Sequence, residues 1–239
     1  MPGELDALYD TDDALQPWYV QGALHLLPID TSSCIRLAWQ LRERDSLRAA
    51  ECLAIATRES ERSGKALSPE GHWLSRLTQA ELLRLQARLA EASATVAGLR
   101  AEEAPGLVLA ADLHGVRAAI ATGAGDFGER DACLRLAADC AARAGEQDRE
   151  LYYRAVLARH RVLRGQEPGP ALDAGLQEPS PRPAYVQAAL HQLRASRSFR
   201  RSDYAQAIEA YVRCHQLALS CGQLHLAIIA ASNIGNAFT

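Results

Sequence analysis

The chain is poor in aromatic residues and in the residues that favour strands. Aromatic residues make up 5% of its 239 residues, and runs of β-branched residues are hard to find. Ala, Leu and Arg recur throughout, and all three favour helix over strand. Hydrophobic residues still reach 48%, which is enough to bury a continuous core. The composition therefore predicts an all-α fold.

The chain also lacks a surplus of positive charge. Its formal net charge is -3 and its isoelectric point lies near 6.2. Such a chain has no general field that would attract nucleic acid or an anionic membrane surface. We expect neither partner.

Nothing at the amino terminus resembles a secretory leader. The first 30 residues are acidic where a leader would be basic, and their uncharged stretch 14–29 contains two prolines and a histidine. That stretch is too short to cross a bilayer, for which a helix needs about 20 apolar residues. The six cysteines show no CxxC spacing, which favours free thiols in a reducing compartment. The sequence thus predicts a soluble, cytoplasmic protein.

Motifs of catalysis are missing as well. The seven histidines form no HExxH, and the chain has no GxSxG, P-loop or GxGxxG. Cys214, Cys221 and His225 have a spacing that one helix could align for a metal, but Gly222 is expected to end that helix before His225. We therefore expect no enzyme, no cofactor and no metal site.

Amphipathic helical segments joined by short breaks are present instead. Residues 31–164 divide into such segments, and Ser68 with Pro69 marks the start of one of them. In the segment that ends at Gly64 the apolar stripe is predicted over Leu47, Ala50, Leu53, Ala54 and Thr57. Consecutive segments are expected to pair as helical hairpins.

Residues 165–183 interrupt this order with five prolines. Proline excludes a long helix there, and only the short run "ALDAGLQ" can be helical. Two interpretations stay open: a degenerate second helix of a hairpin, or a hinge between two blocks of hairpins. Further hairpins follow over 184–239, the last of them truncated.

The stretch "SDYAQAIEAYVRCHQLALSCG" at 202–222 resembles the second helix of a tetratricopeptide repeat (TPR). Its turn, aromatic and small positions are matched by Asp203, Tyr204, Ala207, Tyr211 and Cys214. "NIGNAF" is similar to the first helix of such a repeat, with Ile234, Gly235 and Phe238 at the large, small and aromatic positions. Because the chain ends inside this repeat, we expect the natural protein to continue.

The resemblance implies a right-handed α-solenoid of TPR-like hairpins. Helical segments alternate here with a period of about 40 residues, which is longer than the standard repeat. Repeats of this length resemble sensory regions of bacterial signalling proteins, including those that precede GGDEF diguanylate cyclase domains. We therefore expect a protein- or peptide-binding regulatory module, such as the input region of a diguanylate cyclase.

First helices line the concave groove in TPR arrays, so the resemblance also implies which residues meet a partner. By register these are Trp39, Arg42, Glu81, Arg84, Arg159, Gln192, Ser196 and Asn236. Phe199 and Arg200 lie in the basic run "LRASRSFRRSD", which either binds a carboxylate or phosphate on the partner or is simply a solvated helix face.

The apolar residues of the last segment point to a second kind of contact. Ile234 and Phe238, with Ile228 and Ile229, would form an apolar face without a polar cap, and such faces seek partners. We expect a homo-oligomer formed through the carboxyl-terminal end. Two alternatives to a peptide-binding module stay open: a dimerisation scaffold without ligand, and a small-molecule-binding helical region of a transcription regulator.

Overall fold

A computed structural model describes residues 30–166 and 182–238, and these residues form ten α-helices, one short 3₁₀ helix and no strand. The all-α prediction is confirmed for this part of the chain. The acidic lead up to residue 29 and most of the proline-rich segment, residues 167–181, lie outside the described residues. The helices are α3 (Thr31–Leu41), α4 (Ser46–Ser63), α5 (Pro69–Leu85), α6 (Leu89–Ala97), η2 (Ala101–Glu103), α7 (Leu107–Ala124), α8 (Phe127–Ala144), α9 (Gln147–Leu163), α11 (Ala184–Arg200), α12 (Tyr204–Ser220) and α13 (Leu224–Ala237).

Short polar side chains start several of these helices. Ser68 accepts a hydrogen bond from the Gly71 N–H at 3.0 Å, and Pro69 is the first residue of α5, as predicted. Asp203 caps α12 in the same way, through the N–H of Gln206. These oxygens satisfy N–H groups that have no partner inside the helix.

Most described helix ends share one turn geometry. Gly125, Gly145 and Gly165 adopt positive φ, and each is 20 residues from the next. The residue after each of them donates its N–H to a carbonyl five residues earlier, which closes the end of the helix. Gly222 repeats this pattern 20 residues after Ser202, a non-glycine with φ of 60°. Two such units make up the hairpin period of about 40 residues.

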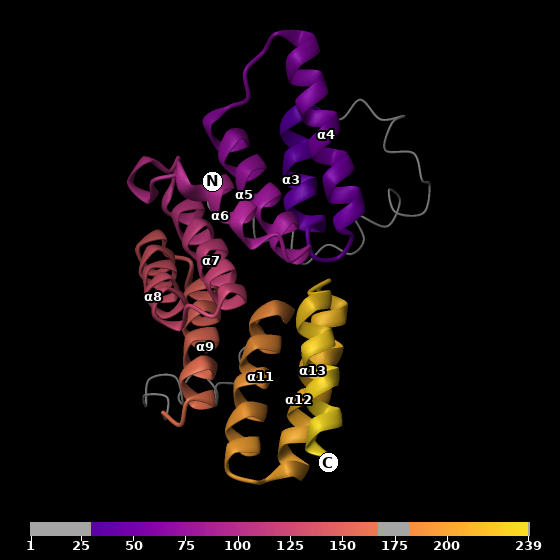
Figure 1. The fold of residues 1–239 in the computed structure, drawn as a ribbon, viewed down its shortest axis with the longest axis vertical. Coiled ribbons are helices and arrows are strands. Elements are labelled where there is room, and N and C mark those ends of the chain that lie inside the picture. Colours follow the sequence, from indigo (N-terminus) through magenta and orange to yellow (C-terminus); the bar gives the residue numbers. More distant parts are fainter. Residues whose placement is uncertain (1–29, 167–181, 239) are drawn as a thin grey trace.

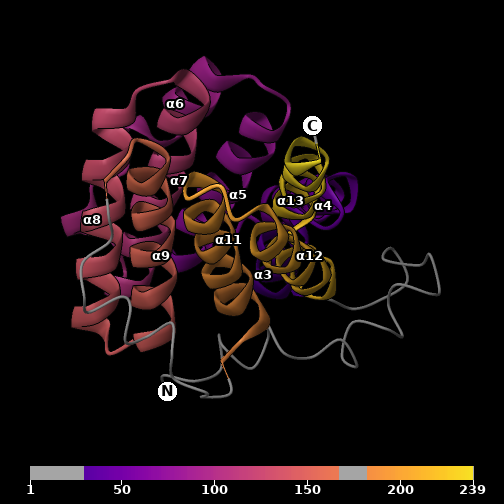
Figure 2. The same ribbon diagram turned by 90° about the horizontal axis from the view of Figure 1, so that it is seen from below.

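The helices follow a curved path (Figure 1). The chain runs from α3 and α4 through α5–α9 to α11–α13, and each helix packs against its neighbours along the sequence. Seen from below, α9, α11 and α12 stand side by side in that order (Figure 2). The turn before α13 meets the turn after α3, where a Cβ on Gly222 would lie 3.0 Å from the Arg44 side chain. The first and last described hairpins are therefore in contact.

Small residues form most of the helix crossings. Six alanines of α7 and α8 are buried in one cluster: Ala110, Ala111, Ala118, Ala137, Ala138 and Ala141. At Gly115 of α7, a Cβ would lie 2.8 Å from the Tyr153 hydroxyl of α9. Without a side chain at position 115, an aromatic ring of another hairpin can approach the backbone of α7.

The predicted stripe of α4 is wrong. Leu47 is 72% exposed, and Ala50, Ala54 and Thr57 are exposed as well. The buried residues are Ala49, Cys52 and Ala56, one position away from the predicted register. Their small side chains let α4 approach α3, whereas the larger Leu47 lies at the start of the helix on its outer side.

Part of the repeat motif is buried as the resemblance implies. Ala207, Tyr211 and Cys214 are each at most 3% exposed and belong to one cluster with α11 and α13. Gly235 differs, because it is exposed and a Cβ there would meet nothing within 4 Å. Gly235 is therefore not at a tight helix crossing.

One helix of the described residues, α7, is long and apolar enough to cross a membrane. More than half of it, 56%, is buried inside the protein, and it carries the buried polar residues Asp112 and His114. These features are typical of a central core helix.

Ala207 provides a test of the α11–α12 packing. Its side chain is fully buried, so Ala207→Leu is expected to overpack the crossing and lower the free energy of unfolding by about 1–3 kcal/mol. Urea unfolding followed by circular dichroism measures the change. Ala205→Leu, on the exposed side of the same helix, is the matched control. Equal stability of the two variants would contradict this packing.

Candidate functional site: a central cavity

A cavity of about 240 Å³ lies on the inner side of the curve. Its walls come almost entirely from every second helix along the chain, namely α3, α5, α7, α9, α11 and α13. The partner helices α4, α6 and α12 contribute nothing to it. The cavity therefore collects residues from hairpins that are far apart in sequence.

Two ion pairs neutralise charged residues of the cavity wall. Glu81 and Arg84, one turn apart on α5, pair at 2.7 Å with side chains only 7% and 12% exposed. Asp112 of α7 accepts a hydrogen bond from Arg149 of α9 at 2.5 Å and another from the Tyr153 hydroxyl at 3.3 Å. Both carboxylates are thus balanced by guanidinium groups, as burial of a charge requires.

A third cation of the wall lies against an aromatic ring. The Arg42 guanidinium lies 3.7 Å from the centre of the Trp39 ring and donates a hydrogen bond to the Trp39 carbonyl. This contact is a cation–π interaction, which fixes the arginine on the ring face.

Three buried polar atoms of the cavity wall have no hydrogen-bond partner among the described residues. They are Nε of Arg159 on α9, Nε2 of Gln192 on α11 and Oε1 of Gln223 at the start of α13. Burial, as the largest influence, lowers the pKa of Arg159. A buried donor or acceptor without a partner costs about 1–3 kcal/mol, so these atoms are expected to gain from a polar occupant.

His160 lies beside Arg159 and also lines the cavity. Burial, together with the positive charges of Arg159 and Arg130, lowers its pKa to about 3. The imidazole is therefore neutral at physiological pH.

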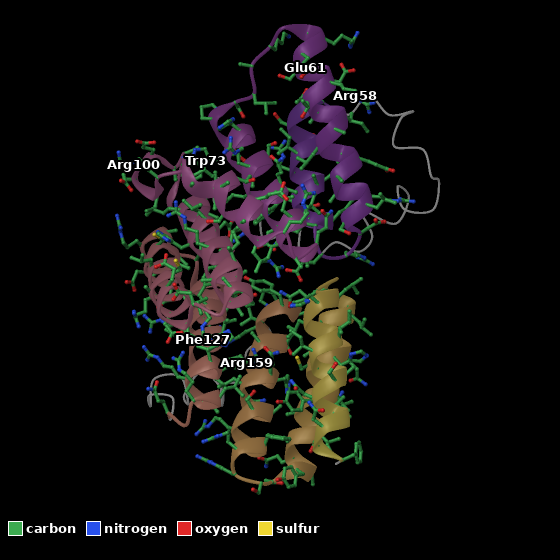
Figure 3. All side chains as sticks on the ribbon, in the orientation of Figure 1. Arg58, Glu61, Trp73, Arg100, Phe127 and Arg159 are labelled. Atoms are coloured by element: carbon green, nitrogen blue, oxygen red, sulfur yellow. The ribbon has the colours of Figure 1, made fainter. Side chains whose placement is uncertain are left out.

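The cavity brings together six of the residues expected to face a partner. These are Trp39, Arg42, Glu81, Arg84, Arg159 and Gln192. Of those that lie elsewhere, Ser196 is buried one turn beyond Gln192, where its hydroxyl donates to the Gln192 carbonyl and lies 3.5 Å from the Tyr211 hydroxyl. Figure 3 shows Arg159 in the region between α9 and α11.

The remaining expected residues lie outside the cavity. Phe199 packs edge-on against Tyr204 at the turn between α11 and α12, and Arg200 is exposed at the end of α11. Asn236 is exposed near the end of α13. Arg194, Arg197 and Arg201 of the basic run each have an interaction of their own. The basic run therefore does not converge on the cavity.

Sequence reasoning missed Gln223, His160 and Tyr152 of the cavity wall. His160 was one residue away from the predicted Arg159, so a wider window on that helix would have included it. Gln223 had no signal in the sequence, because it lies in a turn and reaches the cavity only through the contact between the first and last hairpins.

The cysteines and histidines form no metal site in the described residues. All six cysteines are free, and five are buried. Burial raises the pKa of Cys214 to about 12, so this thiol keeps its proton and is a poor metal ligand. Cys133 and Cys140 belong to the core of α7 and α8, as their spacing predicted.

A second cavity, of about 380 Å³, adjoins the first. The two share Trp39 and Asp112 in their walls. The second cavity has a largely apolar lining that includes Leu74, Leu107 and Leu109. An occupant that passes Trp39 and Asp112 would reach both.

Comparisons with protein-family models, with curated proteins and with solved structures found no match for this chain.

His160 makes the stability of the protein pH-dependent. Its pKa is near 3 in the folded state and near 6.5 in an unfolded chain, so only the unfolded state takes up a proton between these values. As pH falls from 6.5 toward 3, His160 is therefore expected to lower the free energy of unfolding by about 1.4 kcal/mol per pH unit.

Urea unfolding of wild type and His160→Gln at pH 7 and pH 5 measures this contribution. The variant should lose less stability than the wild type between the two values. His72→Gln, at an exposed position, is the matched control and should behave as the wild type does. An identical loss in wild type and His160→Gln would show that His160 is protonated in the folded state.

Proposed function

We propose that the chain is a peptide-binding regulatory module, built as a right-handed α-solenoid of TPR-like hairpins. Two observations support this architecture. Helices that pack with their sequence neighbours alternate between lining the inner cavity and covering the outside. The turns of the described hairpins also recur at equal spacing.

The observation that carries the proposed ligand class is the set of unpaired amide atoms. Gln192 offers a donor and Gln223 an acceptor to the same cavity, and neither atom has a partner among the described residues. A peptide bond has both an N–H and a C=O, so a peptide main chain satisfies the two together. The adjoining apolar cavity has room for a hydrophobic side chain of the same peptide.

The position of the cavity supports a regulatory role. Residues of both the first and the last described hairpins line it, and these hairpins also touch at Arg44 and Gly222. A ligand that contacts both ends therefore favours one spacing between them over another. A change of this spacing is a signal that an attached domain can detect. The TPR resemblance suggests a bacterial signalling protein such as a diguanylate cyclase.

The proposed module acts by binding and not by catalysis, and its partner is a protein or peptide, not nucleic acid or a membrane. We place it in the cytoplasm, and the free thiols support this placement because a reducing compartment keeps them unpaired.

Peptide binding in the cavity is tested with pools of short random peptides and a variant that fills the space. Ala119 of α7 is half-buried and lines the cavity, so Ala119→Trp is expected to exclude a ligand. The fluorescence of Trp39, in the wall of both cavities, reports occupancy in the wild type. At least one pool should bind the wild type with an affinity that Ala119→Trp lowers at least tenfold.

Ala142→Trp, at an exposed position of α8, is the matched control and should bind as the wild type does. Because the added tryptophans also fluoresce, the variants are compared by competition against a labelled peptide. Absence of binding by every pool, or equal binding by Ala119→Trp, would contradict a peptide site in this cavity.

Self-association through α13 is a second proposal, which does not exclude the first. Phe238 is 75% exposed and Ile228 is 65% exposed, so the end of the chain presents apolar surface to a second copy. Ile234 is partly buried against the cluster of α11–α13, so it also stabilises the fold of its own chain.

Phe238→Glu is the cleaner test of this contact, because it leaves the packing of Ile234 intact. Sedimentation equilibrium should show association in the wild type and a monomer in the variant. Leu136→Glu changes an exposed leucine of α8 and should associate as the wild type does. A monomeric wild type would contradict the proposal.

A further inference from the structure

Arg159 is the cation of the cavity whose charge has no carboxylate partner in the described part of the chain. The other guanidinium groups of the wall are engaged: Arg84 pairs with Glu81, and Arg42 lies on the ring of Trp39. No ion pair or hydrogen bond joins Arg159 to a described residue, and its Nε is buried.

The charges near Arg159 do not compensate for its burial. Arg130 is a second cation, and the pKa of Arg159 is lowered by burial and by that charge. Tyr211 and Cys214 act in the opposite direction, but both are neutral when protonated, and burial raises the pKa of the Cys214 thiol to about 12. His160, the next residue, is neutral because its pKa is near 3. The protein therefore holds a cation in a desolvated position at a cost to its own stability.

We propose that Arg159 and Gln192 form a subsite for a carboxylate, and that the ligand of the cavity presents one there. This inference rests on the proposed peptide-binding function and specifies which group of the ligand enters the site. A guanidinium donates to a carboxylate through two N–H groups, and the Gln192 Nε2 donor lines the same cavity on the adjacent helix α11. The carboxylate is that of a peptide's own terminus or of an acidic side chain.

Charge balance favours a carboxylate over a phosphate. The subsite holds one uncompensated cation, which matches the single negative charge of a carboxylate. A phosphate monoester carries about 1.5 to 2 negative charges at neutral pH, and it would require a second cation. Arg42 and Arg84 would have to leave Trp39 and Glu81 to supply it.

The test uses N-acetylglycine and its neutral amide, N-acetylglycinamide, as probes for the full chain. The two differ only in the carboxylate, and both contain a peptide bond. The Nε–H signal of Arg159 in a two-dimensional NMR spectrum, assigned by its loss in Arg159→Lys, reports contact directly. N-acetylglycine should shift this signal to saturation and, at ten times its Kd, raise Tm by about 3–6 °C. N-acetylglycinamide should do neither.

Variants separate a binding role from a purely structural one. Arg159→Met removes the charge and keeps an apolar stem, so it should raise Tm without ligand by at least about 2 °C and abolish the response to N-acetylglycine. A structural arginine would instead lower Tm when replaced. Arg159→Gln should also lose the response, while Arg159→Lys should keep it in the melting assay at lower affinity. Arg154→Met changes an exposed arginine of the same helix and should respond as the wild type does.

The possible results separate this inference from the proposed function. Equal responses to the acid and the amide, or a full response by Arg159→Met, would overturn the carboxylate subsite even where peptide pools bind. Saturation by inorganic phosphate at a lower concentration than N-acetylglycine would overturn the choice of carboxylate. A response to N-acetylglycine that Arg159→Met abolishes would support the subsite, even where no peptide pool binds and the larger proposal fails.

Discussion

Close approach of helices at small residues is the constraint on which the rest of this structure depends. A chain with few aromatic residues has few large side chains to fill gaps, so its helices must come near one another to bury their apolar faces. The alanines shared by α7 and α8, and the absence of a side chain at Gly115, allow this approach. Because one face of each hairpin is packed this tightly, successive hairpins stack along a curve, and that curve creates the inner cavity.

The cavity combines groups that stabilise the protein with groups that do not. Glu81 with Arg84 and Asp112 with Arg149 form buried pairs, and removing one partner of such a pair costs about 3–5 kcal/mol. Arg159 has no such partner in the described chain. A position where a fold retains an uncompensated charge is a common mark of a functional site, because a ligand can supply what the protein lacks.

The contact between Arg44 and Gly222 gives the cavity its mechanical significance. It joins turns that are nearly 180 residues apart in the chain, and a side chain at position 222 would meet Arg44 at 3.0 Å. The outermost described hairpins therefore sense each other directly. An occupant of the cavity touches the same two hairpins, so binding and the spacing between the ends of the described array are linked.

The sequence by itself determined the local structure of this protein. Helix starts at Ser68 and Asp203, the glycine ends, and the burial of Ala207 and Tyr211 depend on interactions within a few residues or within one hairpin. The register of α4 failed, because alanine and leucine positions on a mixed helix do not reveal which face a neighbour will cover. Arg159 and Gln192 were found through a repeat register, but their lack of partners was not, because pairing depends on which distant helices come together. Only the tertiary structure brought Gln223 to the same cavity, since that placement requires the whole curve of stacked hairpins to close.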